Sequence, residues 1–132
     1  LLSHAHQDHY GLLSFVHPDI PIFMSRGTKE LVELSFLFGQ TNCVLKNVVV
    51  VEAWKTFEIK DVKITPYLVD HSGFDAMAFL IEADGKRIFY SGDFRGHGRK
   101  GVLFETMIKK PLEDIDYLIM EGTMTFPRSV DG

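Results

Sequence analysis

The sequence has a single cysteine, no long apolar run and no excess of positive charge, and each of these features excludes a class of protein. Cys43 cannot form an intrachain disulfide, and without a CxxC pair the chain has neither a thiolate metal site nor a redox motif. We expect Cys43 to be a small buried hydrophobe. Every apolar stretch is short and interrupted by charge, so the given residues contain no transmembrane helix and no membrane partner is expected. These features favour a soluble protein of a reducing compartment, such as the cytoplasm.

Basic residues are outnumbered, because 14 Lys and Arg stand against 18 Asp and Glu, for a net charge of -4. The net charge therefore gives no indication of a nucleic-acid partner, although a local basic patch would be enough to bind one. A hydrophobic content of 45% over 132 residues is enough for one compact core and leaves little room for two domains. The oligomeric state is left open, a homo-oligomer included.

The two ends of the sequence suggest a piece of a longer protein. The chain begins at Leu1 rather than Met and reaches its richest motif at the fourth residue, and it ends at 129–132 without a terminating element. The sequence leaves open whether a targeting peptide precedes it.

Hydrophobic periodicity predicts a mixed α/β architecture in which strands predominate and helices cover a sheet. We expect one or two helical turns over 11–16, a helix capped by Thr28 and ended by Gly39, and a helix over 102–110 that Pro111 closes.

Strands are expected where β-branched or alternating apolar residues gather. Leu1-Leu2 should end a buried strand, and Asp84-Gly85 between two apolar runs predicts a hairpin turn. The other expected strands cover 22–24, 48–51, 56–59, 62–69, 76–83, 86–90 and, as a buried strand, 117–120.

One segment near the start of the sequence is dense in metal-binding side chains: His4-Ala5-His6-Gln7-Asp8-His9. In an extended loop, His4 and His6 project to the same side and can close on one metal, while Asp8 and His9 turn toward a second position beside it. Imidazole and carboxylate without thiolate suit zinc first, with manganese or iron as alternatives.

This segment resembles the H-x-H-x-D-H motif of the metallo-β-lactamase superfamily, whose pattern also expects a later His and a later Asp, each at a strand end. His71 in Val69-Asp70-His71-Ser72 and Asp93 in Ser91-Gly92-Asp93 supply them in order. The resemblance implies part of an αββα sandwich, with mixed α and β elements.

The resemblance also implies a dinuclear metal centre. His4, His6 and His71 would hold one divalent ion, Asp8 and His9 the second, and Asp93 would bridge the two; Asp8 and Asp93 are the expected catalytic carboxylates. Two such ions can share a hydroxide whose pKa falls from about 15.7 toward about 7. The implied reaction is metal-assisted hydrolysis.

The match is incomplete, because the family supplies a last His from a late strand and no His follows His97. The first strands of the fold are missing as well. We therefore expect residues 1–132 to be the N-terminal part of a metallo-β-lactamase domain, without its first strands and its C-terminal part.

The segment Tyr117–Thr123 resembles the strand ending in Glu-Ser/Gly-Thr of the RNA-processing branch, the ribonuclease J and polyadenylation-endonuclease group. That branch carries a second, β-CASP domain, which we expect after residue 132. Arg95, Arg99 and Lys100 follow Asp93 in a glycine-rich loop and could meet phosphate oxygens, or they could form a solvated basic loop.

The leading hypothesis is a phosphodiesterase or ribonuclease of RNA processing, with RNA or another phosphodiester as substrate. The first alternative is a hydrolase of the same fold that acts on a small ester, thioester or lactone. The second is a catalytically silent scaffold subunit. The abundant Phe residues are better explained by core packing than by base stacking; they include Phe15, Phe36, Phe38, Phe57, Phe74 and Phe79.

Overall fold

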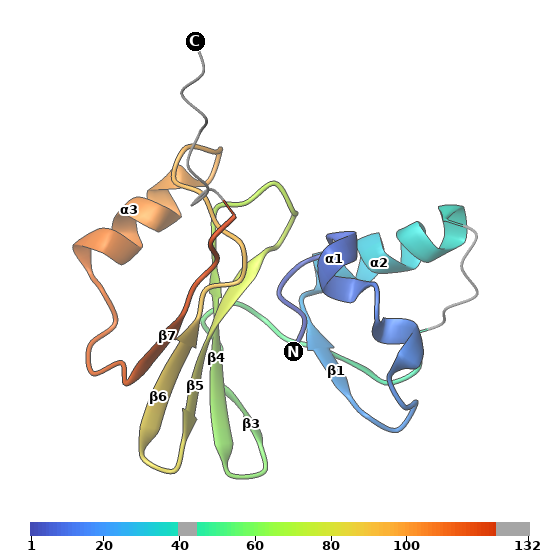
Figure 1. Cartoon of the computed structure of the whole chain (residues 1–132), viewed down its shortest axis with the longest axis horizontal. Coiled ribbons are helices and arrows are strands. Elements are labelled where there is room, and N and C mark those ends of the chain that lie inside the picture. Colours follow the sequence, from blue (N-terminus) through green and yellow to red (C-terminus); the bar gives the residue numbers. More distant parts are fainter. Residues whose placement is uncertain (40–44, 124–132) are drawn as a thin grey trace.

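The computed structural model describes residues 1–39 and 45–123, so Cys43 and the residues beyond Thr123 lie outside the described residues. It confirms a mixed α/β fold, arranged around a two-stranded sheet and a five-stranded sheet (Figure 1). Within these ranges, no helix is long and apolar enough to cross a membrane.

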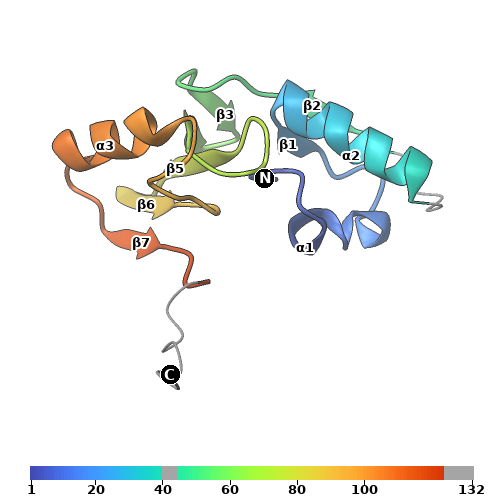
Figure 2. The same cartoon turned by 90° about the horizontal axis from the view of Figure 1, so that it is seen from above.

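The small sheet pairs β1 (Ile22–Met24) with β2 (Val48–Val50) in parallel. A parallel pair needs a crossover connection, and α2 (Arg26–Phe38) supplies it. Two short helices precede β1 and cover the same half of the molecule (Figure 2); they are α1 (Gln7–Tyr10) and the 3₁₀ turn η1 (Leu13–Phe15). The predicted helical turn over 11–16 is confirmed as η1, whereas α1 forms within the segment that was expected to be an extended loop.

Helix α2 begins three residues earlier than predicted, because Ser25 and not Thr28 is its N-cap. The Ser25 hydroxyl accepts a hydrogen bond from the Thr28 amide at 3.0 Å and donates one to the Thr28 hydroxyl at 2.9 Å. Both side chains are buried, which explains why two polar residues can begin a helix that packs on the sheet. Gly39 ends the helix, as predicted.

The large sheet has the order β3-β4-β5-β6-β7. Its first four strands are antiparallel neighbours: β3 (Phe57–Ile59), β4 (Val62–Leu68), β5 (Met77–Ala83) and β6 (Lys86–Tyr90). The predicted turn between β5 and β6 is confirmed, since Asp84 and Gly85 both have positive φ, as a two-residue hairpin loop of this kind requires. β7 (Tyr117–Ile119) returns parallel to β6 after the crossover helix α3 (Gly101–Lys109).

Strand β5 contributes to two separate cores, because alternate side chains point to opposite faces of a sheet. Ala78 and Leu80 join the cluster on one face, and Met77 and Phe79 join the cluster on the other. All four are buried. The sheet is therefore covered on both sides at its centre.

One prediction of burial was wrong and another held for half of its residues. β7 is an exposed edge strand of the described sheet rather than a buried one, with Tyr117, Leu118 and Ile119 all more than half exposed. Of the Phe residues assigned to the core, Phe79 is buried and Phe36 and Phe57 pack at core edges. The others are exposed: Phe15, Phe38 and Phe74.

The first residues of the chain connect the two sheets. The Leu2 amide donates to the carbonyl of Phe23 in β1 at 2.9 Å, and the Met77 amide in β5 donates to the carbonyl of Ser3 at 2.9 Å. Leu2 is buried as expected, although residues 1–4 belong to no strand. This arrangement fixes the next residue, His4, at the junction of the sheets.

Candidate metal centre

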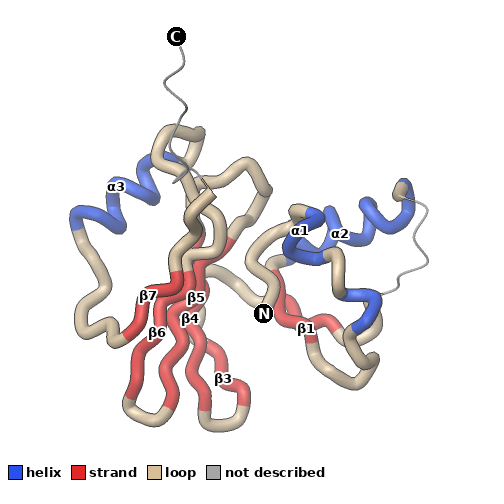
Figure 3. Tube along the Cα trace, viewed as in Figure 1, coloured by secondary structure: helices blue, strands red, loops and turns tan. Residues whose placement is uncertain are grey.

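The six residues expected to bind metal come from three segments that meet at one edge of the large sheet. β4 and β6 both run antiparallel to β5, so their carboxyl ends lie at the same edge. His71 follows β4 and Asp93 follows β6, in segments drawn as loop (Figure 3). The segment from His4 to His9, which ends in α1, brings the remaining ligands.

A first ligand group is formed by His4, His6, His71 and Asp93. The distance from His6 Nδ1 is 3.0 Å to His4 Nε2 and 3.0 Å to His71 Nε2. Asp93 Oδ2 lies 3.9 Å from both Nε2 atoms. A tetrahedral zinc ion with bonds of about 2.0–2.1 Å to nitrogen holds neighbouring nitrogens about 3.3 Å apart, so this group has the right size for such an ion.

A second ligand group is formed by Asp8, His9 and Asp93. His9 Nε2 lies 3.4 Å from Asp93 Oδ1 and 3.5 Å from Asp8 Oδ2. Asp93 thus presents Oδ2 to the first group and Oδ1 to the second. A carboxylate with one oxygen on each side is suited to bridge two cations.

The electrostatic environment keeps the central imidazole neutral. Burial, followed by the neighbouring imidazoles of His9, His71 and His6, lowers the pKa of His4 to about 3. Burial and the nearby His6 also lower the pKa of His71. A neutral imidazole keeps the lone pair that a metal requires.

Ser3 is a residue of the site whose role the sequence did not reveal. Its hydroxyl lies 3.0 Å from His4 Nδ1 and 3.5 Å from His9 Nδ1, and its side chain is buried. It therefore contacts one imidazole from each ligand group, on the ring nitrogen opposite the one that faces the group. Its place directly before His4 at a buried segment was the available signal.

Gly73 allows the histidines to pack closely. A Cβ atom at this position would lie 3.2 Å from His4 Cδ2 and 3.5 Å from His71 Cδ2, which is tight for one ring and ordinary contact for the other. A larger residue would displace the His4 ring.

The basic loop after Asp93 is organised by Asp70. The Arg95 amide donates to the Asp70 carbonyl at 2.7 Å, and Arg95 Nε lies 3.6 Å from Asp70 Oδ1. Arg99 is exposed and Lys100 is half-buried. Of the three cations expected to meet phosphate, Arg95 thus has an acidic partner inside the protein.

Glu121, two residues beyond β7, also contacts this loop. Its carboxylate accepts a hydrogen bond from the Phe94 amide at 2.6 Å, and its own amide donates to the Ser91 hydroxyl at 3.2 Å. The Glu-Gly-Thr segment was noted in the sequence only as a family resemblance. In the structure its Glu is close enough to His71 to favour the protonated form of that imidazole.

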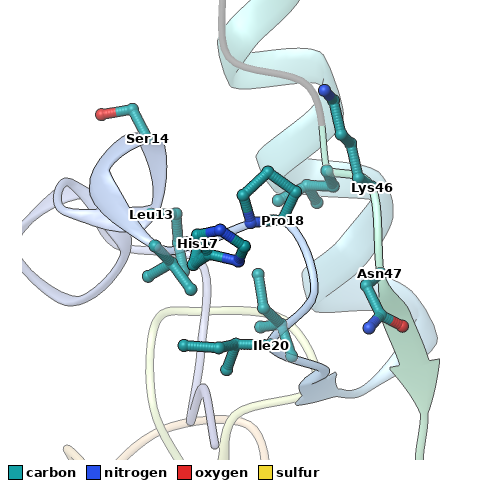
Figure 4. Close-up of a pocket in the computed structure, with 10 residues that line it drawn as sticks. Leu13, Ser14, His17, Pro18, Ile20, Lys46 and Asn47 are labelled. Atoms are coloured by element: carbon teal, nitrogen blue, oxygen red, sulfur yellow. The ribbon is translucent and has the colours of Figure 1, made fainter.

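A hollow lies elsewhere on the molecule, between η1, β1 and the segment before β2 (Figure 4). Its lining mixes apolar side chains, such as Leu13 and Ile20, with polar ones, among them His17, Lys46 and Asn47. His17 is exposed and pairs with Asp19 at 3.7 Å. The hollow contains none of the six expected ligands.

These features define the class of the protein: the chain belongs to the family described as the β-lactamase superfamily domain, which matches residues 1–131. A protein of unknown function from Enterococcus faecalis has the same fold, with a TM-score of 0.85, 24% identity, and 96% of this chain and 32% of that chain covered. Zn²⁺-bound PqqB from Methylobacterium extorquens gives a TM-score of 0.66 and 18% identity over 92% of this chain and 44% of that chain.

The chain is also similar to proteins named as ribonucleases. Ribonuclease J of Mycoplasma pneumoniae is 30% identical over 96 residues, or 71% of this chain. Endoribonuclease ysh-1 of Neurospora crassa is 31% identical over 146 aligned positions, or 93% of this chain. The chain spans 17% of the length of each of these relatives.

Proposed function

We propose that the protein is a dinuclear metal-dependent hydrolase that cleaves phosphodiesters, and that it acts as a ribonuclease in RNA processing. The observation that carries the proposal is the position of Asp93, with one carboxylate oxygen toward each of two ligand groups. A single metal site would need only one of these groups.

The residues fit two divalent cations. In the first group, three imidazole nitrogens converge without thiolate, which suits zinc before manganese or iron. Asp8, His9 and Asp93 offer a second ion one nitrogen and two carboxylates. When bound, such a pair of ions activates water as a nucleophile at neutral pH and stabilises negative charge on the attacked centre.

The residues around the ligands would fix their orientation. With Nε2 of His4 free of a proton, Nδ1 carries it and donates to Ser3 Oγ. This bond holds the ring so that Nε2 faces His6 and Asp93. The tautomer follows from the requirement that the ligating nitrogen is unprotonated.

The substrate is inferred from the relatives and from the basic loop. Both named relatives are called ribonucleases. Arg99 is exposed and Lys100 is half-exposed in the loop that follows Asp93, where they could contact phosphate oxygens. A β-CASP domain after residue 132 remains a prediction.

The test uses the full-length protein with single-stranded RNA and, in parallel, a panel of lactones and thioesters. We expect RNA cleavage that stops when a chelator is added and returns with zinc or manganese. Turnover of the small esters alone would move the protein to the first alternative. Metal-loaded protein without any turnover would favour the scaffold subunit.

A further inference from the structure

We propose that Asp70 is a positioning residue that sets the spacing between His71 and Asp93, and so the affinity and geometry of the metal pair. The inference rests on the proposed function, because it concerns the same centre. Among the described contacts, Asp70 makes no hydrogen bond or ion pair to any of the six ligand residues. It acts through the loop that follows Asp93.

The contacts of Asp70 link two ligand-bearing segments that are far apart in the sequence. Asp70 directly precedes His71, and its carbonyl accepts a hydrogen bond from the Arg95 amide at 2.7 Å. Its Oδ2 accepts from the Gly98 amide at 2.6 Å, and its Oδ1 accepts from the Lys100 amide at 3.3 Å. The segment immediately before one ligand therefore holds the loop immediately after the other.

The charge of Asp70 matters because its side chain is only 1% exposed. A buried carboxylate is costly unless charge-assisted hydrogen bonds or cations compensate it. The loop supplies two amides and, 3.6 Å away, the Arg95 guanidinium. Helix α3 begins directly after this loop, so the carboxylate also lies near its positive end.

Gly98 is required for this approach of loop and carboxylate. A Cβ atom there would lie 2.6 Å from Arg95 Nη2 and still closer to Asp70 Oδ1, which no real structure tolerates without a shift. The glycine-rich composition of the loop is thus explained by its packing around Asp70. Within the described contacts, Arg95 is the cation that pairs with Asp70, which leaves the exposed Arg99 and the half-buried Lys100 as the remaining cations of the loop.

The experiment compares wild type, Asp70→Asn and Asp116→Asn in the full-length protein. Asp116 is a matched control because its carboxylate also accepts a hydrogen bond from a backbone amide, that of Arg87, and pairs with a cation, Lys86. It lies before β7, beside the start of β6, whereas Asp93 follows the end of that strand. Zinc affinity is measured by competition with a chromophoric chelator, and ligand geometry is followed by the visible absorption of the cobalt(II)-substituted protein.

We expect Asp70→Asn to weaken zinc binding by about 10-fold or more, in the range seen when outer partners of metal ligands are removed, and to change the cobalt spectrum. Asp116→Asn should leave both unchanged. Gly98→Ala, which keeps every charge but pushes the loop away, should weaken zinc binding in the same direction and serves as a second variant if Asp70→Asn does not fold.

Two results would overturn the proposal, and they are distinguishable. If wild type binds two zinc ions and both loop variants bind them with wild-type affinity and spectrum, Asp70 is a structural residue only, even if the melting temperature falls. If wild type binds no metal after reconstitution, the proposed function fails and this inference fails with it.

Discussion

The two ligand groups differ in how completely the described residues assemble them. In the first, three imidazole nitrogens and a carboxylate converge, His4 is fully buried, and the nearest nitrogens are 3.0 Å apart. In the second, one imidazole stands with two carboxylates, and the side chain of Asp8 is 77% exposed.

This difference indicates which of the two metal sites is better pre-organised by the fold. Rigid, buried ligands lose little conformational freedom when they bind, whereas an exposed carboxylate must be ordered at that moment. We therefore expect the first group to bind its metal more tightly than the second. Asp93 belongs to both groups, so its substitution should affect both metal sites at once.

The largest effect is expected for Asp93→Asn. The amide keeps the shape of the carboxylate but removes the negative charge that faces both groups, and its nitrogen cannot ligate a cation. Hydrolytic activity should fall by more than about 100-fold, beyond the cost of losing an outer partner of a ligand, and bound metal should drop below two equivalents. Elemental analysis and RNA-cleavage rates measure the two outcomes.

A result of two full equivalents in Asp93→Asn would contradict the bridging role. Asp75→Asn is the matched control, because the Asp75 carboxylate accepts a hydrogen bond from the Gly27 amide and takes part in neither ligand group. It should retain both metals.

The next largest effect is expected from variants that each remove a ligand from only one of the two groups. His71→Ala should abolish the tighter of two binding phases in a zinc titration, because it removes one of three imidazoles from the buried group. His9→Ala should abolish only the weaker phase, since the first group does not include His9. Isothermal titration of the metal-free protein gives both affinities.

If both variants lost the same phase, the two groups would not be separate sites. A single phase of one equivalent in wild type would mean that the second group needs further ligands to hold a metal. The prediction is sharpest for full-length protein, where any additional ligand would be present.

A smaller effect is expected from the two remaining cations of the basic loop, Arg99 and Lys100. Replacing Arg99 and Lys100 together with Gln should weaken RNA binding and flatten its dependence on salt, because fewer counterions are released when fewer phosphates are neutralised. Metal content should not change. An unaltered salt slope, measured by fluorescence anisotropy over a range of salt concentrations, would assign the loop to structure.

Local patterns predicted most of the elements, because they record which side chains face a core. The Asp84-Gly85 hairpin and the strands around it depend on adjacent residues and were located correctly. The start of α2 was misplaced because Ser25 and Thr28 are both good caps, and only the buried hydroxyl contacts distinguish them. The exposure of β7 could not be read from its apolar sequence, since burial depends on which elements cover a strand.

In the candidate site, too, features set by neighbouring residues were predicted, whereas features set by tertiary contacts were not. All six expected ligands are brought together, because each is a metal-binding residue type placed after a strand or within one short motif. Ser3 and Asp70 were not assigned roles, although each directly precedes an expected ligand. Their functions depend on distances to residues far along the chain, such as the 2.6 Å between Asp70 and the Gly98 amide, and a single sequence does not contain such distances.

The smallest effect is expected at the opposite end of β6 from Asp93, where Asp116 pairs with Lys86 and belongs to neither ligand group. The hydrogen bond from Lys86, followed by the hydrogen bond from the Arg87 amide, lowers the pKa of Asp116 in the folded protein. A carboxyl group with a lowered folded pKa stabilises the protein above its unfolded pKa, near 3.8, and this stabilisation is lost as the pH falls through the folded pKa. Asp116→Asn should therefore lower the urea midpoint slightly at pH 7, and the difference from wild type should shrink below about pH 4. Because the group is exposed, high salt should shrink the difference as well. Midpoints measured for metal-free protein across this pH range give the comparison, and a difference that grows on acidification would contradict the assigned ion pair.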